Sequence, residues 1–255
     1  MTVPHLVATA ADSADAPLLV LGPSLGSVGS TLWSTTIPHL ADRFRIVTWD
    51  LPGHGASPKA TQAFTIADLA DGVVAILDEL GVSKAFYAGV SIGGGTGLEL
   101  ALRHPDRIER VAMICASYRF ATPESWHERA QQVRTQSTSS LVVATAQRWF
   151  APGRMEANPV IDGLLLHNLQ DADDESYALA CEALAAFDLE PRLADITIPV
   201  LDVWGDKDPT IAWDTALKIA ATVPQGSATA IEDAAHLAPA DQPEAVAEAL
   251  IDFFA

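Results

Sequence analysis

The chain has 255 residues, 49% of them hydrophobic, which is enough for one large α/β domain with a sizeable buried core. Its net charge of −18 argues against nucleic acid or an anionic membrane surface as a partner, and no apolar run approaches the ~20 residues of a membrane-spanning helix. The two cysteines, Cys115 and Cys181, exclude a disulfide-rich scaffold, and no Cys/His spacing indicates a metal site. Because the N-terminus has no basic segment followed by an apolar one, we expect no signal peptide and a cytoplasmic location.

Apolar runs alternate with helix-like segments along most of the chain. Residues 66–80 place apolar side chains at helical spacing, Thr65 and Asp68 resemble a capping box, and Gly81 ends the helix. Further helices are expected at 94–103 and 243–254, and strands at 17–22, 45–49, 84–88, 110–116, 198–205 and 228–231. Near-continuous apolar strands that alternate with helices predict an α/β fold, with a mostly parallel central sheet covered by helices on both faces.

Residues 119–189 break this alternation, because they have helix-like patterning and no convincing strand. They lie between two core strands, and ligands of open α/β sheets bind outside the carboxyl ends of the strands. We therefore expect residues 1–118 and 190–255 to form the core and residues 119–189 to form a helical lid. An extra helical layer with only a packing role is the alternative.

Ser91 is the centre of a G-x-S-x-G sequence at residues 89–93, between the strand expected at 84–88 and the helix expected at 94–103. At such a turn the serine backbone is strained and the hydroxyl is exposed, while the glycines let strand and helix approach closely. We predict that Ser91 is a nucleophile and that the N–H group of Ile92 points toward the oxyanion that its attack creates.

A nucleophilic serine needs a base, usually a histidine that a carboxylate orients, and the chain order at such turns is Ser, Asp or Glu, then His. Of the seven histidines, only His236 follows the strand at 198–205, so we predict that His236 is the base. The loop at 205–209 offers two carboxylates. We favour Asp208 over Asp206, because Asp208 lies further out in the loop and the proline after it stiffens the backbone, whereas Asp206 is nearer the strand.

The second oxyanion donor is expected in the loop at 22–27, after the first core strand. Pro23 has no N–H group, which leaves Ser24 and Leu25, and we favour Leu25 because a flexible glycine follows it. His54, in a Pro-Gly-His-Gly sequence, is interpreted as a residue that packs against and hydrogen-bonds the loop near the site.

These residues resemble the α/β-hydrolase superfamily along nearly the whole chain, and within it the 3-oxoadipate enol-lactonases of the β-ketoadipate pathway. Segments shared with many α/β hydrolases are S-L-G at 24–26, W-D-L-P-G-H-G-A-S-P at 49–58 and R-H-P-D-R-I at 103–108. Segments closer to the enol-lactonases are T-P-E-S-W-H-E-R at 122–129, R-W-F at 148–150, Tyr177 with C-E-A at 181–183, A-A-H-L at 234–237 and Q-P-E at 242–244.

The resemblance implies that Ser91, Asp208 and His236 take the triad positions and that Leu25 and Ile92 take the oxyanion positions. It also implies hydrolysis of a small lactone through an acyl-enzyme, giving a 3-oxo dicarboxylic acid without a cofactor. Two segments depart from the pattern: Pro23 stands where these lactonases commonly have Asn, and A-P-A-D at 238–241 replaces a more usual S-N-x-E. Both lie beside the catalytic loops and bear on the choice of lactone rather than on the hydrolase chemistry.

Such a lactone carries a free carboxylate, which a strongly acidic chain repels, although physiological salt screens exposed charges beyond ~8 Å. The expected lid supplies five arginines, Arg119, Arg129, Arg134, Arg148 and Arg154. We predict that Arg129, Arg134 or Arg148 binds the carboxylate, and the alternative is that these residues form salt bridges on the lid surface. An apolar wall is expected from two tryptophans, Trp126 and Trp149.

The leading function is therefore a small-lactone hydrolase. A general carboxylesterase or a cofactor-free haloperoxidase-like perhydrolase is compatible with the same fold, and so is a hydrolase-like receptor whose triad serves ligand binding. A haloalkane dehalogenase is disfavoured, because its nucleophile is a carboxylate where this chain has Ser91. The expected partner is a small lactone or ester, and the sequence does not predict the oligomeric state.

Overall fold

A computed structural model describes residues 3–11 and 16–255, so residues 1, 2 and 12–15 of the expected core lie outside the described residues. Seven strands of the described chain form one sheet, in the order β1-β3-β2-β4-β5-β6-β7. They are β1 (Ala8–Ala11), β2 (Leu18–Gly22), β3 (Arg45–Trp49), β4 (Ala85–Val90), β5 (Ile108–Ile114), β6 (Val200–Gly205) and β7 (Gly226–Ile231). β1 is antiparallel to β3, and the other neighbouring pairs are parallel, which confirms the predicted sheet type.

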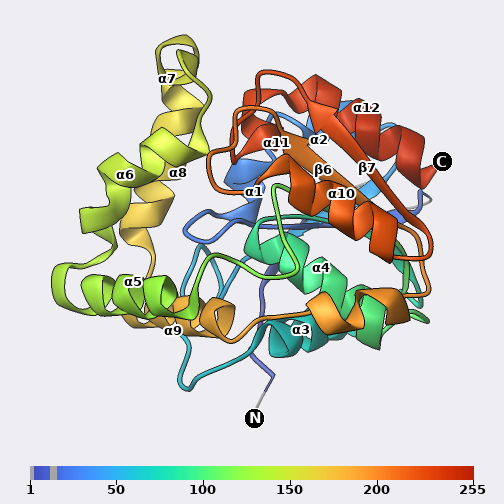
Figure 1. Cartoon of the computed structure of the whole chain (residues 1–255), viewed down its shortest axis with the longest axis horizontal. Helices are drawn as coiled ribbons and strands as arrows, with labels where there is room; N and C mark the ends of the chain where they lie inside the picture. Colours follow the sequence, from blue (N-terminus) through green and yellow to red (C-terminus); the bar gives the residue numbers. More distant parts are fainter. Residues whose placement is uncertain (1–2, 12–15) are drawn as a thin grey trace.

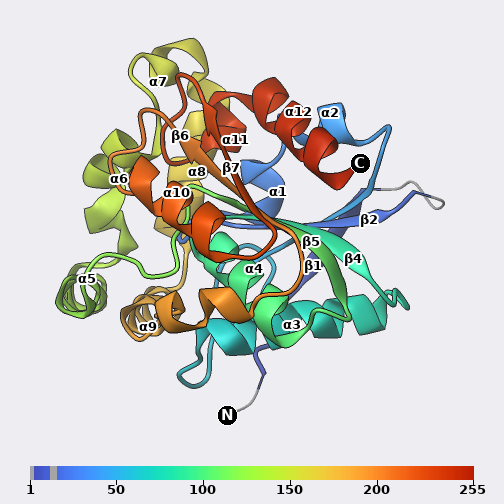
Figure 2. The same ribbon diagram turned by 45° about the vertical axis from the view of Figure 1, so that its right-hand side comes forward.

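Helices cover both faces of this sheet. Those of the core are α1 (Gly29–Leu32), α2 (Ile37–Leu40), α3 (Ile66–Glu79), α4 (Ile92–Arg103), α10 (Trp213–Thr222), α11 (Ala238–Asp241) and α12 (Pro243–Phe254), with a 3-10 helix η2 (Glu190–Asp195). Figure 2 shows α2 and α12 together on one side of the sheet and α3 and α4 together on the other. The layers thus follow the alternation of strands and helices in the sequence.

The capping box at α3 is confirmed. The Thr65 hydroxyl accepts the N–H group of Asp68 at 3.1 Å, and the Asp68 carboxylate accepts the N–H group of Thr65 at 2.8 Å. These bonds satisfy N–H groups that a helix start leaves without partners, and Gly81, with a φ of 66°, turns the chain away after the helix.

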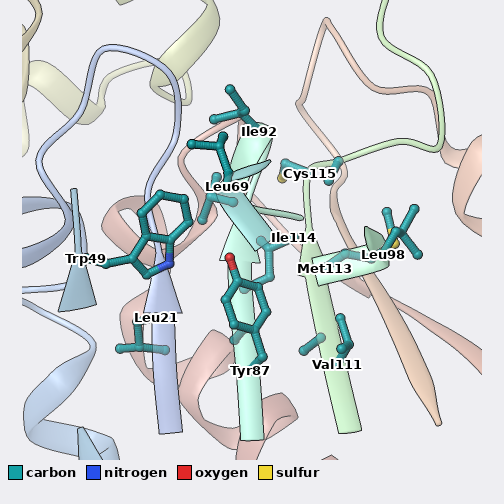
Figure 3. Close-up of a cluster of buried hydrophobic side chains, with 14 of the residues drawn as sticks. Leu21, Trp49, Leu69, Tyr87, Ile92, Leu98, Val111, Met113, Ile114 and Cys115 are labelled. Carbon is teal, nitrogen blue, oxygen red and sulfur yellow. The ribbon is translucent and has the colours of Figure 1, made fainter. Parts of the chain in front are cut away.

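The middle strands β2, β4 and β5 carry fully buried side chains, and Figure 3 shows Leu21, Tyr87 and Val111 on these three strands. The Tyr87 hydroxyl donates to the carbonyl oxygen of Gly93 at 2.8 Å, in the first turn of α4. Burial raises the pKa of Tyr87, so the phenol keeps the proton that it donates. A core side chain therefore fixes the helix that follows β4.

Some element boundaries differ from the prediction. β1 was not predicted, because A-T-A-A lacks the long apolar side chains that mark the buried strands. β5 ends at Ile114 rather than at residue 116, because Cys115 has a φ of 45° and ends the extended chain. α4 begins at Ile92, two residues before the predicted start at 94, so its first turn adjoins the serine of the G-x-S-x-G sequence.

Residues 119–189, here called the helical insertion, lie outside the sheet on the left of Figure 1. The insertion comprises α5 (Pro123–Gln136), η1 (Thr138–Leu141), α6 (Val142–Trp149), α7 (Arg154–Ala157), α8 (Pro159–Asp171) and α9 (Asp174–Ala185). Its two ends meet in an isolated β-bridge between Arg119 and Asp188. None of the helices in the described part of the chain has the length and hydropathy to cross a membrane.

Candidate active site

Ser91 lies at the turn between β4 and α4, in the strand–turn–helix context that the sequence predicts. Its φ of 55° and ψ of −117° place it in a sparsely populated conformation, which costs a non-glycine residue on the order of 1–3 kcal/mol. A Cβ atom at Gly89 would lie 2.4 Å from the carbonyl carbon of Gly93, and one at Gly93 would lie 2.6 Å from the carbonyl oxygen of Pro23. The two glycines therefore allow the strand, the helix and the neighbouring loop to meet at the serine.

His236 and Asp208 come from the loops after β7 and β6 and form a buried hydrogen-bonded pair, with 2.9 Å between His236 Nδ1 and Asp208 Oδ2. The other Asp208 oxygen accepts the N–H and hydroxyl groups of Thr210, at 2.8 and 2.6 Å. Because the carboxylate holds the proton on Nδ1, Nε2 of the neutral ring is free to accept a proton. Asp206, the other carboxylate of this loop, instead pairs with Lys207 at the surface, at 2.6 Å.

Burial alone would raise the pKa of Asp208. The charge and hydrogen bond of His236, together with the two bonds from Thr210, overcome this effect and hold the pKa of Asp208 below its usual value. The carboxylate is therefore ionised at neutral pH.

Leu25 and Ile92 are both buried residues, and the N–H group of neither has a partner among the hydrogen bonds of the described residues. The N–H group of Ser24, the other candidate in this loop, already donates to the hydroxyl oxygen of Ser27 at 3.0 Å. An unpaired buried N–H group is costly unless a ligand satisfies it. The lack of partners is compatible with the oxyanion role predicted for these two N–H groups, which stays a prediction.

His54 supports the loop that carries Leu25, which confirms the interpretation from the sequence. Its Nε2 accepts the N–H group of Gly26 at 3.2 Å, while its Nδ1 donates to the carbonyl oxygen of Pro52 at 2.9 Å. Burial lowers the pKa of His54 to about 4, so the ring is neutral at pH 7 and keeps one donor and one acceptor.

A cavity of about 250 Å³ opens beside Ser91 and His236. Its wall consists of Ser24, Leu25, Ser91, Phe120, Ala121, Ser125, Trp126, Arg129, Arg148, Trp149, Thr210, Ile211 and His236. The two tryptophans expected as an apolar wall are among these residues. In residues 3–11 and 16–255, no group of three or more His, Cys, Asp or Glu side chains is placed to hold a metal ion.

Two arginines line this cavity and have no acidic partner within the described chain. Arg129 lies over the rings of Trp126 and Tyr177, at 5.5 and 5.6 Å, and its Nε is buried without a hydrogen-bond partner. Arg148 donates to the hydroxyl of Thr145 at 2.9 Å, and burial together with the charge of Arg129 lowers its pKa. Both arginines are partly buried. Because charges removed from water are normally paired, two uncompensated cations in one cavity favour an anionic ligand.

Arg134, the third candidate for the substrate carboxylate, does not line the cavity. It links α5 to α9 by ion pairs with Glu175, at 2.7 Å, and with Glu182. Arg119 and Arg154 likewise pair with aspartates. The alternative prediction, that the arginines of the insertion form salt bridges, therefore holds for Arg119, Arg134 and Arg154. It does not hold for the two arginines that line the cavity.

Comparison with known proteins agrees with this geometry. The profile of the family described as alpha/beta hydrolase fold matches residues 17–143. A 3-oxoadipate enol-lactonase of Acinetobacter baylyi is 34% identical over 232 residues, which cover 91% of this chain and 86% of that protein. The chain belongs to the α/β-hydrolase family of enzymes.

One solved structure and one further relative are also similar to this α/β hydrolase. The crystal structure of the enol-lactonase from Burkholderia xenovorans LB400 superposes with a TM-score of 0.93 at 33% identity, covering 98% of this chain and 96% of that chain. A relative from Serratia proteamaculans, 30% identical and covering 84% of this chain and 82% of that protein, has a name that proposes carbamate hydrolysis.

Sequence reasoning missed several residues of the hydrolase's cavity wall, namely Phe120, Ala121, Ser125, Thr210 and Ile211. Thr210 had a signal, because a hydroxyl residue two positions after an aspartate commonly bonds to its carboxylate. Phe120, Ala121 and Ile211 follow β5 or β6 in loops without a motif. Ser125 lies in the first turn of α5, inside the T-P-E-S-W-H-E-R segment, whose likeness to the enol-lactonases does not indicate which of its side chains line the cavity.

Proposed function

We propose that this α/β hydrolase opens a small lactone that carries a free carboxylate, with 3-oxoadipate enol-lactone as the substrate and 3-oxoadipate as the product. The observation that carries the proposal is the pair Arg129 and Arg148, two cations without an acidic partner in the described residues, in the cavity that Ser91 lines. The names of the relatives from Acinetobacter baylyi and Burkholderia xenovorans support the same substrate.

In the first half of the proposed reaction, His236 Nε2 accepts the hydroxyl proton of Ser91 while the serine oxygen attacks the lactone carbonyl carbon. Asp208 stabilises the resulting imidazolium, and the N–H groups of Leu25 and Ile92 bind the negative carbonyl oxygen. The bond to the ring oxygen then breaks, and His236 returns its proton to that oxygen. The opened enol stays attached through the acyl group on Ser91.

In the second half, His236 accepts a proton from a water molecule, whose oxygen attacks the acyl carbonyl carbon. The bond to Ser91 breaks, the serine oxygen regains a proton from His236, and the carboxylic acid leaves. The enol becomes the 3-oxo acid by moving its proton to carbon. Lactone and water account for every atom of the product, so the reaction consumes no cofactor.

We also propose that the helical insertion is the lid of this site. It supplies both cavity arginines and both tryptophans of the cavity wall, whereas Ser91 and His236 come from the core. The core would then carry the acyl-transfer groups, and the insertion would select the substrate.

The test compares loss of enol-lactone, followed by its ultraviolet absorbance, with hydrolysis of a neutral short-chain aryl ester. Ser91→Ala is expected to abolish both activities. Arg148→Met is expected to raise KM for the lactone, because a charge-assisted bond to a carboxylate contributes about 1.5–3 kcal/mol, which is roughly a 10- to 150-fold loss of kcat/KM. Arg134→Ala is the matched control, and it is expected to leave both activities unchanged because its guanidinium binds Glu175 and Glu182.

Each alternative has its own outcome in the same assay. Hydrolysis of the ester without turnover of the lactone indicates a general carboxylesterase, and faster turnover of a carbamate indicates the activity that the Serratia relative's name proposes. Peroxide-dependent acyl transfer that exceeds hydrolysis indicates a perhydrolase. Tight retention of the lactone with negligible turnover indicates a receptor.

A further inference from the structure

The Asp241 carboxylate, in α11, joins the histidine loop to the helical insertion. One of its oxygens, Oδ2, accepts the N–H group of Ala235 at 2.8 Å and the N–H group of Ala151 at 3.1 Å. Ala235 directly precedes His236, and Ala151 belongs to the insertion, just after α6. The carboxylate is almost fully buried, so both bonds are shielded from water.

The two segments that Asp241 joins also pair with each other. The N–H group of His236 donates to the carbonyl oxygen of Arg148 at 3.4 Å, and that of Leu237 donates to the carbonyl oxygen of Trp149 at 3.0 Å. His236 and Arg148 both line the cavity. Three hydrogen-bonded links therefore set the placement of the histidine relative to the arginine.

The Ala235 peptide is also held from the core. The thiol of Cys115 donates to the carbonyl oxygen of Ala235 at 3.4 Å, and Figure 3 shows Cys115 at the end of the strand that carries Ile114. Burial raises the pKa of Cys115, so the thiol keeps its proton. The residue before His236 thus has its N–H group bound by Asp241 and its carbonyl oxygen bound by the core.

Arg154 lies against Asp241 from the insertion side. Its Nε is 3.9 Å from Asp241 Oδ1 and 3.3 Å from an oxygen of the buried Asp162. Burial raises the pKa of Asp241 to about 6, while Arg154 and the two N–H groups oppose this rise and Asp162 adds to it. Lys207 and Asp233 are further charged residues near Asp241, because they line a cavity that Asp241 and Arg154 also line. Arg154 and the two N–H groups favour the ionised carboxylate, and in that form the two bonds that it accepts are charge-assisted.

We infer that Asp241 is a positioning residue, which holds the base His236 and the anion-binding Arg148 in a fixed relative placement. The inference rests on the proposed function, in which these two residues act on the same substrate. Without the carboxylate, the N–H groups of Ala235 and Ala151 lose their shared partner. Only the two direct backbone bonds, from His236 to Arg148 and from Leu237 to Trp149, then hold the segments together, and the longer of them is 3.4 Å. A displacement of about 1 Å at a catalytic group can cost on the order of 100-fold in rate.

The experiment measures the placement of His236 and the placement of Arg148 separately, and neither measurement requires turnover of the lactone. Hydrolysis of a neutral aryl ester reports on His236, and inhibition of that hydrolysis by adipate, a dicarboxylate, reports on Arg148. Asp241→Ala is expected to lower kcat for the ester by roughly 10- to 100-fold and to raise the adipate Ki by a similar factor. Asp241→Asn, whose amide oxygen can accept the same two bonds, is expected to restore both values to within a few-fold of the wild type.

Ala151→Pro separates the two effects, because it deletes the N–H donor on the insertion side alone. The preceding residue, Phe150, is extended with a φ of −113° and a ψ of 140°, the conformation that a residue before proline prefers. It is expected to raise the adipate Ki while kcat for the ester stays within about 2-fold of the wild type. It also keeps the inference testable if Asp241→Ala does not fold.

Asp162→Ala is the matched control for Asp241→Ala, because Asp162 is equally buried and contacts Arg154 but bonds to neither Ala235 nor Ala151. Variants are compared at a temperature where urea unfolding shows each of them to be folded. The inference is overturned if Asp241→Ala matches Asp162→Ala in kcat and Ki, or if Ala151→Pro leaves the Ki unchanged. Failure of the wild type to open the lactone would instead refute the proposed function, because the ester and adipate measurements do not depend on it.

Discussion

Replacing Asp202 with valine is expected to stabilise the protein, although Asp202 lies inside the sheet, in the strand next to the edge strand β7. The residue is in β6, between Met113 of β5 and Ala228 of β7, and its side chain is fully buried. Neither carboxyl oxygen has a hydrogen-bond partner in the described residues, and burial raises the pKa of Asp202 far above its usual value. The folded protein therefore carries a neutral, unsatisfied carboxylic acid at this position.

Two effects contribute to the expected gain. Burying a neutral polar group without a hydrogen bond costs about 1–3 kcal/mol, which valine, of similar size and higher strand preference, avoids. In addition, the folded state binds a proton that the unfolded state releases above pH ~3.9. The contribution of Asp202 is therefore most favourable below that pH and falls as the pH rises, by about 1.4 kcal/mol per pH unit while the folded protein keeps the proton.

Urea unfolding of wild type, Asp202→Val and Asp202→Asn at pH 5, 6 and 7 separates these effects. The asparagine keeps unsatisfied polar atoms but cannot ionise, so its free energy of unfolding relative to wild type should grow by about 1.4 kcal/mol per pH unit. The valine should exceed the asparagine by about 1–3 kcal/mol at every pH, which is roughly 2–12 °C in Tm for a chain of this size. A valine variant that is less stable than wild type, or an asparagine difference that does not change with pH, would refute the reasoning.

Gly93→Ala is expected to reduce both stability and ester hydrolysis. Its Cβ would lie 2.6 Å from the Pro23 carbonyl oxygen and would push the loop at residues 22–27, which carries Leu25, away from α4. Gly163→Ala in α8 is the control, since no atom lies within 4 Å of the added carbon, and it should raise the free energy of unfolding by about 0.5–1 kcal/mol. Asp208→Asn is expected to lower kcat by about 10³–10⁴-fold with a smaller change in KM, because the amide no longer fixes the His236 tautomer or its charge. Steady-state kinetics check the first and third changes, and a fall in kcat below tenfold for Asp208→Asn would contradict the assigned role.

Much of the candidate site was predictable from local sequence because it depends on strand ends. Ser91 is identified by glycines that the turn requires, and its strand–turn–helix placement is confirmed. His236 and Asp208 each follow a predicted strand, and the carboxyl ends of parallel strands meet at one edge of a sheet. Their pairing thus follows from strand order, while their catalytic roles stay predictions.

Other features had no local signal. β1 is short and rich in alanine, and it is defined by pairing with β3 rather than by its own hydrophobic pattern. The link from Asp241 to Ala151 spans 90 residues, so the sequence around either residue does not indicate it. The choice between Asp206 and Asp208 depended on loop geometry, because both are acidic residues of one short turn.

The sequence by itself determined the class of fold and the order of the candidate triad, because glycine turns and strand periodicity are properties of neighbouring residues. Only the tertiary structure decided which arginines face the cavity. Arg134 meets acids 41 and 48 residues further along the chain, on a helix packed beside its own. Arg129 and Arg148 meet none within the described chain, and they line the cavity beside Ser91. Whether a charge is neutralised depends on partners that only folding brings near, and here that difference separates a surface salt bridge from a candidate binding site for the substrate carboxylate.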